Sequence, residues 1–228
     1  MSDPVESNQR WLLLIAAVFI ACLLAANITA VKLIEVGGEV LPAAIIVFPV
    51  SYIVGDVMTE VYGFRVARRV IWTGFLANLI LVAFIFLAQL LPSAGFWEEN
   101  QAAYETILGF TARVLVASFA GYLVGEFSNS FMLAKLKVRT AGRWLALRTI
   151  GSTVVGQGLD SIVFITIAFA AVFPGDELLR LIVVQWLVKV AYETLATPLT
   201  YGAVTLLKRS EGVDAFDVET DFNPISVR

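Results

Sequence analysis

Five carboxylates lie inside long apolar stretches of this sequence, where ionisable side chains are rare. They are Asp56, Glu60, Glu126, Asp160 and Glu193. A charged group at the centre of a bilayer costs about 2.5–3.5 kcal/mol on insertion scales, so it is retained where it faces a cavity, a partner or a polar ligand. The acids therefore predict a polar site buried within an apolar helical bundle, an arrangement typical of transporters.

Further polar side chains share a helix face with these acids, because residues three or four apart lie on one side of a helix. The sequence contains four such stripes: Tyr52, Asp56 and Glu60; Tyr122, Glu126 and Asn129; Thr153, Gln157, Asp160 and Phe164; and Gln185, Lys189, Glu193 and Thr197. Polar stripes that face lipid would be prohibitively costly. We therefore expect the four stripes to converge on a common interior.

The residue types in the stripes suit a planar heterocycle with several N–H donors. Carboxylates can accept its N–H groups, the amides of Gln157 and Asn129 can meet its carbonyl, and the rings of Tyr52 and Phe164 can stack on its face. This chemistry fits the residues without being specified by them.

Structural pairing is the alternative explanation for some of these charges. Lys189 and Glu193 are four residues apart and could form an ion pair along one helix. Asp56, Glu60 and Glu126 fall in the cytoplasmic half of their stretches and are candidates for proton coupling or gating. Desolvation makes a buried carboxylate easier to protonate near neutral pH, which is what proton coupling needs.

The composition predicts an all-α integral membrane protein. Hydrophobic residues make up 59% of the 228 residues and charged residues 15%. A helix needs about 20 apolar residues to span a bilayer, and six stretches qualify: Trp11–Val31, Leu41–Tyr62, Val70–Leu91, Leu108–Leu133, Leu147–Phe173 and Leu178–Leu207. We expect one six-helix transmembrane domain over residues 11–207, after a cytoplasmic segment 1–10 and before a disordered cytoplasmic tail 208–228.

Alternate loops are basic, which predicts that both termini are cytoplasmic. The basic loops hold Arg65, Arg68 and Arg69, then Lys135, Lys137, Arg139 and Arg143, then Lys208 and Arg209, whereas the intervening loops are acidic. Arg113 is expected at the outer end of its stretch, as an interfacial anchor or a partner of Glu105. Topology explains the basic loops better than nucleic-acid binding does, so no nucleic-acid partner is expected.

Prolines and small residues mark places where the helices depart from regularity or approach closely. Pro42 and Pro49 lie in the second stretch and Pro198 in the sixth; in transporters such breaks often adjoin the binding site, although a packing kink explains them equally well. Small residues four apart permit close helix packing, within a monomer or between subunits. The two sets are Ala17, Ala21 and Ala25, and Gly121 and Gly125.

Cysteine and histidine usage excludes several kinds of site. Cys22 is the one cysteine, so neither an intrachain disulfide nor a cysteine-cluster metal site can form, and the chain has no histidine. No metal and no cofactor are expected.

The second stretch carries a sequence that resembles the hallmark of the queuosine-precursor transporter family, earlier described as vitamin uptake transporters. The resemblance lies in the run from Phe48 to Gly63, followed by Arg65, Arg68, Arg69 and Trp72, and in the runs from Gly125 to Asn129, from Arg148 to Ser161 and from Lys189 to Pro198. It covers nearly the whole membrane domain. On these motifs the resemblance carries over Asp56, Glu60, Glu126, Asn129, Gln157, Asp160, Lys189 and Glu193 as candidate functional residues.

The resemblance implies import of 7-cyano-7-deazaguanine or 7-aminomethyl-7-deazaguanine across a bacterial inner membrane, by a secondary carrier that is a homodimer. It also implies a fold similar to the six-helix substrate-binding subunits of energy-coupling-factor transporters. We assign Asp160 and Glu193 to the N–H edge of the ligand, with Gln157 and Asn129 as amide partners. The alternatives are a substrate-binding subunit of an energy-coupled vitamin importer, whose partner module the alanine stripe could dock, an intramembrane enzyme and a purely structural protein.

Overall fold

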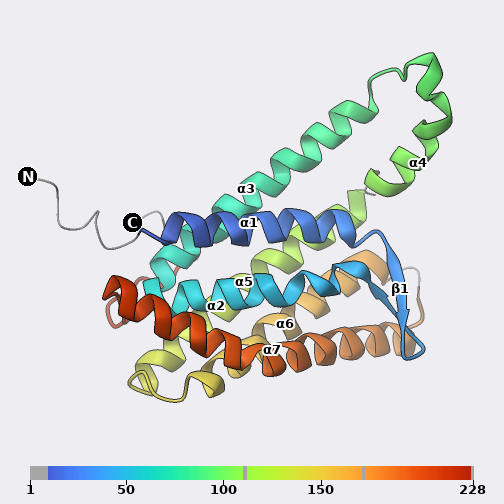
Figure 1. Ribbon diagram of the computed structural model, residues 1–228. Helices are drawn as coiled ribbons and strands as arrows, with labels where there is room; N and C mark the ends of the chain where they lie inside the picture. The colour runs from blue at the N-terminus through green and yellow to red at the C-terminus, as the bar shows by residue number, and fades with distance from the viewer. Residues whose placement is uncertain (1–9, 110–111, 171–172, 227–228) are drawn as a thin grey trace, which may run out of the picture.

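The computed structural model describes residues 10–109, 112–170 and 173–226, and within them the chain is almost entirely helical. The helices are α1 (Leu12–Thr29), α2 (Phe48–Tyr62), α3 (Phe64–Gln89), α4 (Glu98–Leu108), α5 (Ala112–Arg139), α6 (Leu145–Phe169) and α7 (Gly175–Glu211). Short 3-10 turns, η2 (Ala43–Ile46) and η3 (Gly95–Trp97), precede α2 and α4. Figure 1 shows α1, α2, α5, α6 and α7 side by side in one bundle, with the second half of α3 and α4 projecting from it.

Four segments of the described chain are long and apolar enough to cross a membrane: α1, α3, the stretch Gly95–Arg139 that contains α5, and α6. Apolar side chains such as Leu76, Phe84 and Phe86 are exposed along α3, as expected of a surface that faces lipid. The protein is thus a multi-pass helical membrane protein. The expectation of six spans stays a prediction, because α2 has only 15 residues and α7 carries charged residues at its middle.

The predicted second span, Leu41–Tyr62, is not one continuous helix. Its start belongs to a β-hairpin of β1 (Leu33–Val36) and β2 (Glu39–Pro42), which the sequence analysis missed. Gly37 and Gly38 have φ of 63° and 85°, the left-handed conformations that a two-residue hairpin turn requires. The prolines separate elements here, since Pro42 ends β2 and Pro49 lies in the first turn of α2, where a missing N–H costs no helical bond.

The ends of the bundle are tied together by polar contacts. The backbone N–H of Trp11, before α1, donates to Glu211 Oε1 at the end of α7 (2.8 Å), and Tyr62 Oη donates to Glu211 Oε2 (2.6 Å). The start of α1 and the end of α7 therefore lie at the same end of the bundle (Figure 1). A chain that crosses a membrane an even number of times has its two ends on the same side, and this arrangement agrees with that expectation.

The tail differs from the disordered segment that the sequence predicts from Lys208 onward. Helix α7 continues to Glu211, and the following residues lie against the ends of α2 and α3. Buried Arg68 donates to the carbonyl oxygens of Asp221 (2.9 Å) and Asn223 (2.8 Å), and Asp217 accepts the N–H of Phe64 (2.9 Å). The acidic composition suggested disorder, but the basic helix ends and their unpaired N–H groups give this tail specific partners.

Candidate functional site

A cavity of about 130 Å³ lies between α1, α2, α5, α6 and α7. Six of the predicted site residues line it: Tyr52, Glu126, Gln157, Asp160, Phe164 and Lys189. A buried water needs roughly 10–15 Å³ of such space, so the cavity can hold a small organic molecule or a group of waters. The structure therefore brings these six residues together around one cavity.

Helices α5 and α6 form the polar wall of the cavity because glycines let them approach closely. A Cβ at Gly125 would lie 2.7 Å from Asp160 Cβ, and one at Gly156 would lie 2.6 Å from Asn129 Cβ. A Cβ at Gly121 would lie 2.8 Å from Asp160 Oδ1. The small-residue spacing of Gly121 and Gly125 on α5 thus serves packing within the monomer. By contrast, Ala17 and Ala21 lie on an exposed face of α1.

The ion pair at the cavity joins two helices. Lys189 on α7 contacts Asp160 Oδ2 on α6, and both residues line the cavity. The pair between Lys189 and Glu193 that helical spacing suggested is not present among the described contacts, because α6 packs against α7 at the level of Lys189. Asp160 is thus engaged by a cation from the protein itself, whereas Glu126 on the same wall accepts no hydrogen bond from any described residue.

Three predicted site residues lie beside the cavity but do not line it. Asn129 donates to Asp56 Oδ1 (2.7 Å), and both side chains are buried. Glu193 is fully buried, and neither of its carboxylate oxygens accepts a hydrogen bond from a described residue. Asp56 Oδ2 and Asn129 Oδ1 are also without a described partner. Such buried polar atoms cost free energy unless water, a ligand or a change of protonation satisfies them.

The cavity is also lined by residues that the sequence analysis missed. Asn27 on α1 donates to Asn78 Oδ1 on α3 (2.9 Å) and accepts from Ser118 on α5 (3.2 Å). Asn27 and Ser118 line the cavity together with Ser51. The sequence offers one signal for these residues. Asn27 and Asn78 are amides in otherwise apolar helices, and a polar side chain within a membrane helix needs a partner. Arg113, expected to be an interfacial anchor or a partner of Glu105, donates to the carbonyl oxygen of Ile167 at 2.5 Å.

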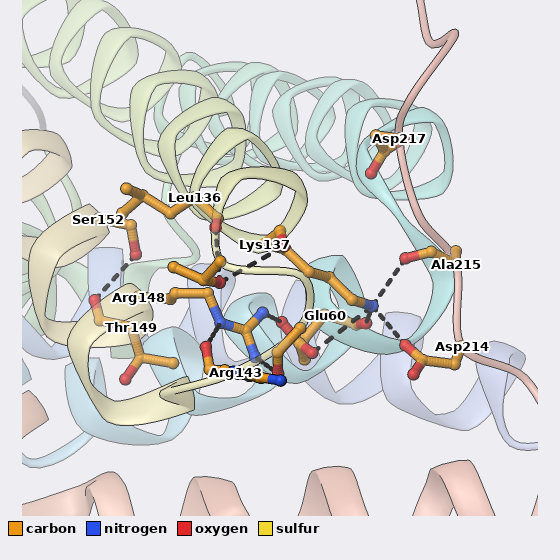
Figure 2. Close-up of polar contacts among 12 residues, drawn as sticks. Glu60, Leu136, Lys137, Arg143, Arg148, Thr149, Ser152, Asp214, Ala215 and Asp217 are labelled. Carbon is orange, nitrogen blue, oxygen red and sulfur yellow. Dashed lines mark hydrogen bonds and ion pairs between the residues drawn. The ribbon is translucent and has the colours of Figure 1, made fainter.

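Glu60 belongs to a separate polar cluster at the end of the bundle where the basic loops gather. Its carboxylate contacts Arg148 on α6, lies 2.7 Å from Lys208 Nζ on α7 and lies 3.5 Å from Lys137 Nζ on α5. Figure 2 shows Glu60 between Arg148 and Lys137, with Lys137 also reaching Asp214 (2.5 Å) and the carbonyl oxygen of Ala215 (2.7 Å) in the tail. We call Glu60, Lys137, Arg148, Lys208 and Asp214 the Glu60 cluster.

Contacts within the Glu60 cluster also shift the pKa values of Asp214 and Lys208. Burial raises the pKa of Asp214, but the hydrogen bonds from Lys137 and Lys208 outweigh burial and leave that pKa below its usual value of 3.8. Burial lowers the pKa of Lys208, but hydrogen bonds to Asp214 and Glu60 outweigh it and raise the pKa above 10.5. Both charges are therefore held across the physiological pH range, and the cluster is an electrostatic link between four helices and the tail.

The cavity combines acceptors with an aromatic face. Glu126 and Gln157 line it, Gln157 Oε1 has no described donor, and the ring of Phe164 supplies a flat apolar surface. Groups of three or more acidic or cysteine side chains placed to hold a metal ion are not found in residues 10–109, 112–170 and 173–226. The cavity thus presents both charged and apolar groups in one buried space.

Taken with the apolar helices, this buried polar cavity defines a multi-pass membrane protein of the small-molecule transporter class. The family model described as "Putative vitamin uptake transporter" matches residues 42–203, and the chain belongs to this family, as the hallmark run in α2 indicated. No solved structure matches the chain significantly.

Curated relatives carry a more specific name. The chain is 28% identical to the "Probable queuosine precursor transporter" of Bacillus subtilis, over 82% of this chain and 81% of the relative. It is 27% identical to the "Queuosine precursor transporter" of Escherichia coli, over 71% of this chain and 72% of the relative. The similarity spans most of both chains in each case.

Proposed function

We propose that this protein imports a deazapurine precursor of queuosine across the bacterial inner membrane. The cavity carries the proposal, because it combines acceptors for N–H groups, an amide and an aromatic face in one buried space. The names of the relatives from B. subtilis and E. coli support the same class of cargo. The candidates are 7-cyano-7-deazaguanine and 7-aminomethyl-7-deazaguanine.

In this proposal the residues divide into three groups. Asp160, Gln157 and Lys189 bind the polar edge of the base, and Tyr52 and Phe164 lie against its ring. Asp56 and Glu193 lie behind this wall and would take part in proton coupling, since oxygens of both carboxylates lack described donors, and Asn129 would position Asp56 through its hydrogen bond. Glu60 would act in gating through the Glu60 cluster, which joins α2, α5, α6, α7 and the tail. Both termini would be cytoplasmic, with six crossings and a homodimeric assembly.

Replacing Asp160 by asparagine tests the proposed site. The carboxylate is a described partner of Lys189 at the cavity, so Asp160→Asn removes this ion pair and weakens the polar edge. We expect precursor uptake to fall by at least tenfold in cells that cannot make queuosine, measured as queuosine in tRNA at limiting precursor. Asp176→Asn, the same change at an exposed position in the first turn of α7, is the matched control. Unchanged tRNA modification in Asp160→Asn cells would refute the assignment.

The second candidate function is a substrate-binding subunit of an energy-coupled vitamin importer. The exposed face of α1 that carries Ala17 and Ala21 favours it, because closely packing residues on an exposed face could dock a partner helix. Uptake by this chain alone in proteoliposomes would exclude this alternative. The same vesicles, with and without a protonophore, separate proton coupling from facilitated diffusion.

A further inference from the structure

The cavity has one more acidic side chain than basic. Its charged lining residues are Glu126, Asp160 and Lys189, and the described ion pair joins Asp160 to Lys189, so Glu126 is the acidic lining residue outside a described ion pair. Glu126 is 6% exposed, and its side chain extends towards α2. A Cβ added at Gly55 on α2 would lie 3.6 Å from Glu126 Oε2. A carboxylate removed from water in this way is costly unless a cation or hydrogen-bond donors meet it.

The amide oxygen of Gln157 is a second acceptor at the cavity. Gln157 is 2% exposed, and its Oε1 accepts no hydrogen bond from a described residue. The other buried cations, Arg68, Lys137 and Arg148, are engaged by the tail or by the Glu60 cluster. Among the described residues, Lys189 is thus the one cation that lines the cavity. The charged side chains that line the cavity are therefore one positive charge short, and Gln157 Oε1 lacks a described donor. A cationic cargo with N–H groups can supply both.

From this we infer that Glu126 is the counter-ion of a cationic cargo, so that the protein selects a deazapurine with an aminomethyl arm over one with a cyano group. The inference rests on the proposed function. A protonated aminomethyl arm brings one positive charge and several N–H donors, whereas a nitrile is a neutral acceptor and finds surplus acceptors facing it. Gln157 Oε1 accepts a second N–H from the same cargo.

Competition binding to the purified full-length protein tests the inference, with the two deazapurines measured separately against wild type and Glu126→Gln. A charge-assisted hydrogen bond contributes about ten- to hundred-fold in affinity. We expect wild type to favour the aminomethyl compound by this factor. Glu126→Gln should lose the preference and retain the affinity for the cyano compound within about threefold. Glu105→Gln, the same change on the exposed surface of α4, is the control.

Glu126→Asp separates a charge requirement from a packing requirement, since it keeps the carboxylate and shortens the arm. It should retain part of the preference, and a normal elution profile in size-exclusion chromatography shows that each variant is folded. Equal loss of both compounds in Glu126→Gln, an unchanged preference or a wild-type preference for the cyano compound would overturn the inference while the proposed function stands. Failure of wild type to bind either compound overturns the proposed function and the inference with it.

Discussion

Replacing Glu60 by glutamine should lower the free energy of unfolding by about 3–5 kcal/mol, the cost of removing one partner from a buried ion pair. Glu60 is 1% exposed and contacts three cations. Asp214 remains for Lys137 and Lys208 after the change, but its side chain is 45% exposed. Arg148, whose side chain is 2% exposed, would keep only the carbonyl oxygens of Arg143 and Gly142. The cost therefore arises mainly from a buried guanidinium without a carboxylate.

Thermal unfolding of the purified protein measures this cost. For a chain of this length, 1 kcal/mol corresponds to about 2–4 °C in Tm, so Glu60→Gln should lower Tm by about 6–20 °C. Glu219→Gln, the same change at an exposed position of the tail, should shift Tm by less than about 2 °C, as surface substitutions do. A shift in Glu60→Gln no larger than that of the control would refute a stabilising role for the cluster.

A double substitution separates the ion pair from other effects of the change. Removing both partners of a buried pair is far less costly than removing one, because no uncompensated charge remains. Glu60→Gln combined with Arg148→Gln should therefore be less destabilising than the sum of the single changes, by about 0.5–3 kcal/mol of coupling. Additive effects would show that Glu60 and Arg148 act independently.

Three further outcomes follow from other contacts. Gly125→Ala places a Cβ 2.7 Å from that of Asp160 and should destabilise by about 1–3 kcal/mol in a Tm measurement, whereas Gly202→Ala on α7, with nothing within 4 Å, should not destabilise. Because the pKa of Asp214 is lowered in the folded state, its stabilisation is present above pH 3.8 and is lost as the pH falls through the lower folded value; Asp214→Asn should remove this part of the acid dependence of Tm. Deleting the chain beyond Gly212 should lower Tm, and limited proteolysis of the intact protein should spare residues 213–226; rapid cleavage there would contradict the packed tail.

The helical spacing of polar residues predicted the cavity wall well, because in a membrane bundle few arrangements keep polar stripes away from lipid. The spacing could not predict which side chains of that wall form ion pairs with one another. Spacing along α7 pairs Lys189 with Glu193, but the glycine-mediated packing of α5 and α6 and the position of α7 bring Asp160 to Lys189 instead. Contacts between helices depend on their separation and rotation, which a single sequence does not specify.

The break before α2 and the packed tail were missed for a different reason. The apolar run that begins at Leu41 predicts a helix. Because the chain turns at Gly37 and Gly38, the first residues of this run instead form a strand that pairs with β1. The basic residues at the helix ends were explained as topology signals, and this explanation left no reason to look for acidic partners. Arg68 and Lys137 also bind the tail. Composition alone does not separate this role from the predicted role of basic residues in setting membrane topology.

The positions of the cavity and the Glu60 cluster constrain how a cargo could move. Asp56 and Glu60 lie one turn apart on α2, yet Asp56 adjoins the cavity through Asn129 while Glu60 is enclosed by cations at the basic end. The cluster that links α2, α5, α6, α7 and the tail lies at that end, and none of its five residues lines the cavity. If the basic end is cytoplasmic, as proposed, we expect inward release of cargo to separate the contacts of Glu60 with at least one of Arg148, Lys137 and Lys208. The tail takes part in the same contacts through Asp214, and so the stability of the cluster and the rate of inward release should change in opposite directions.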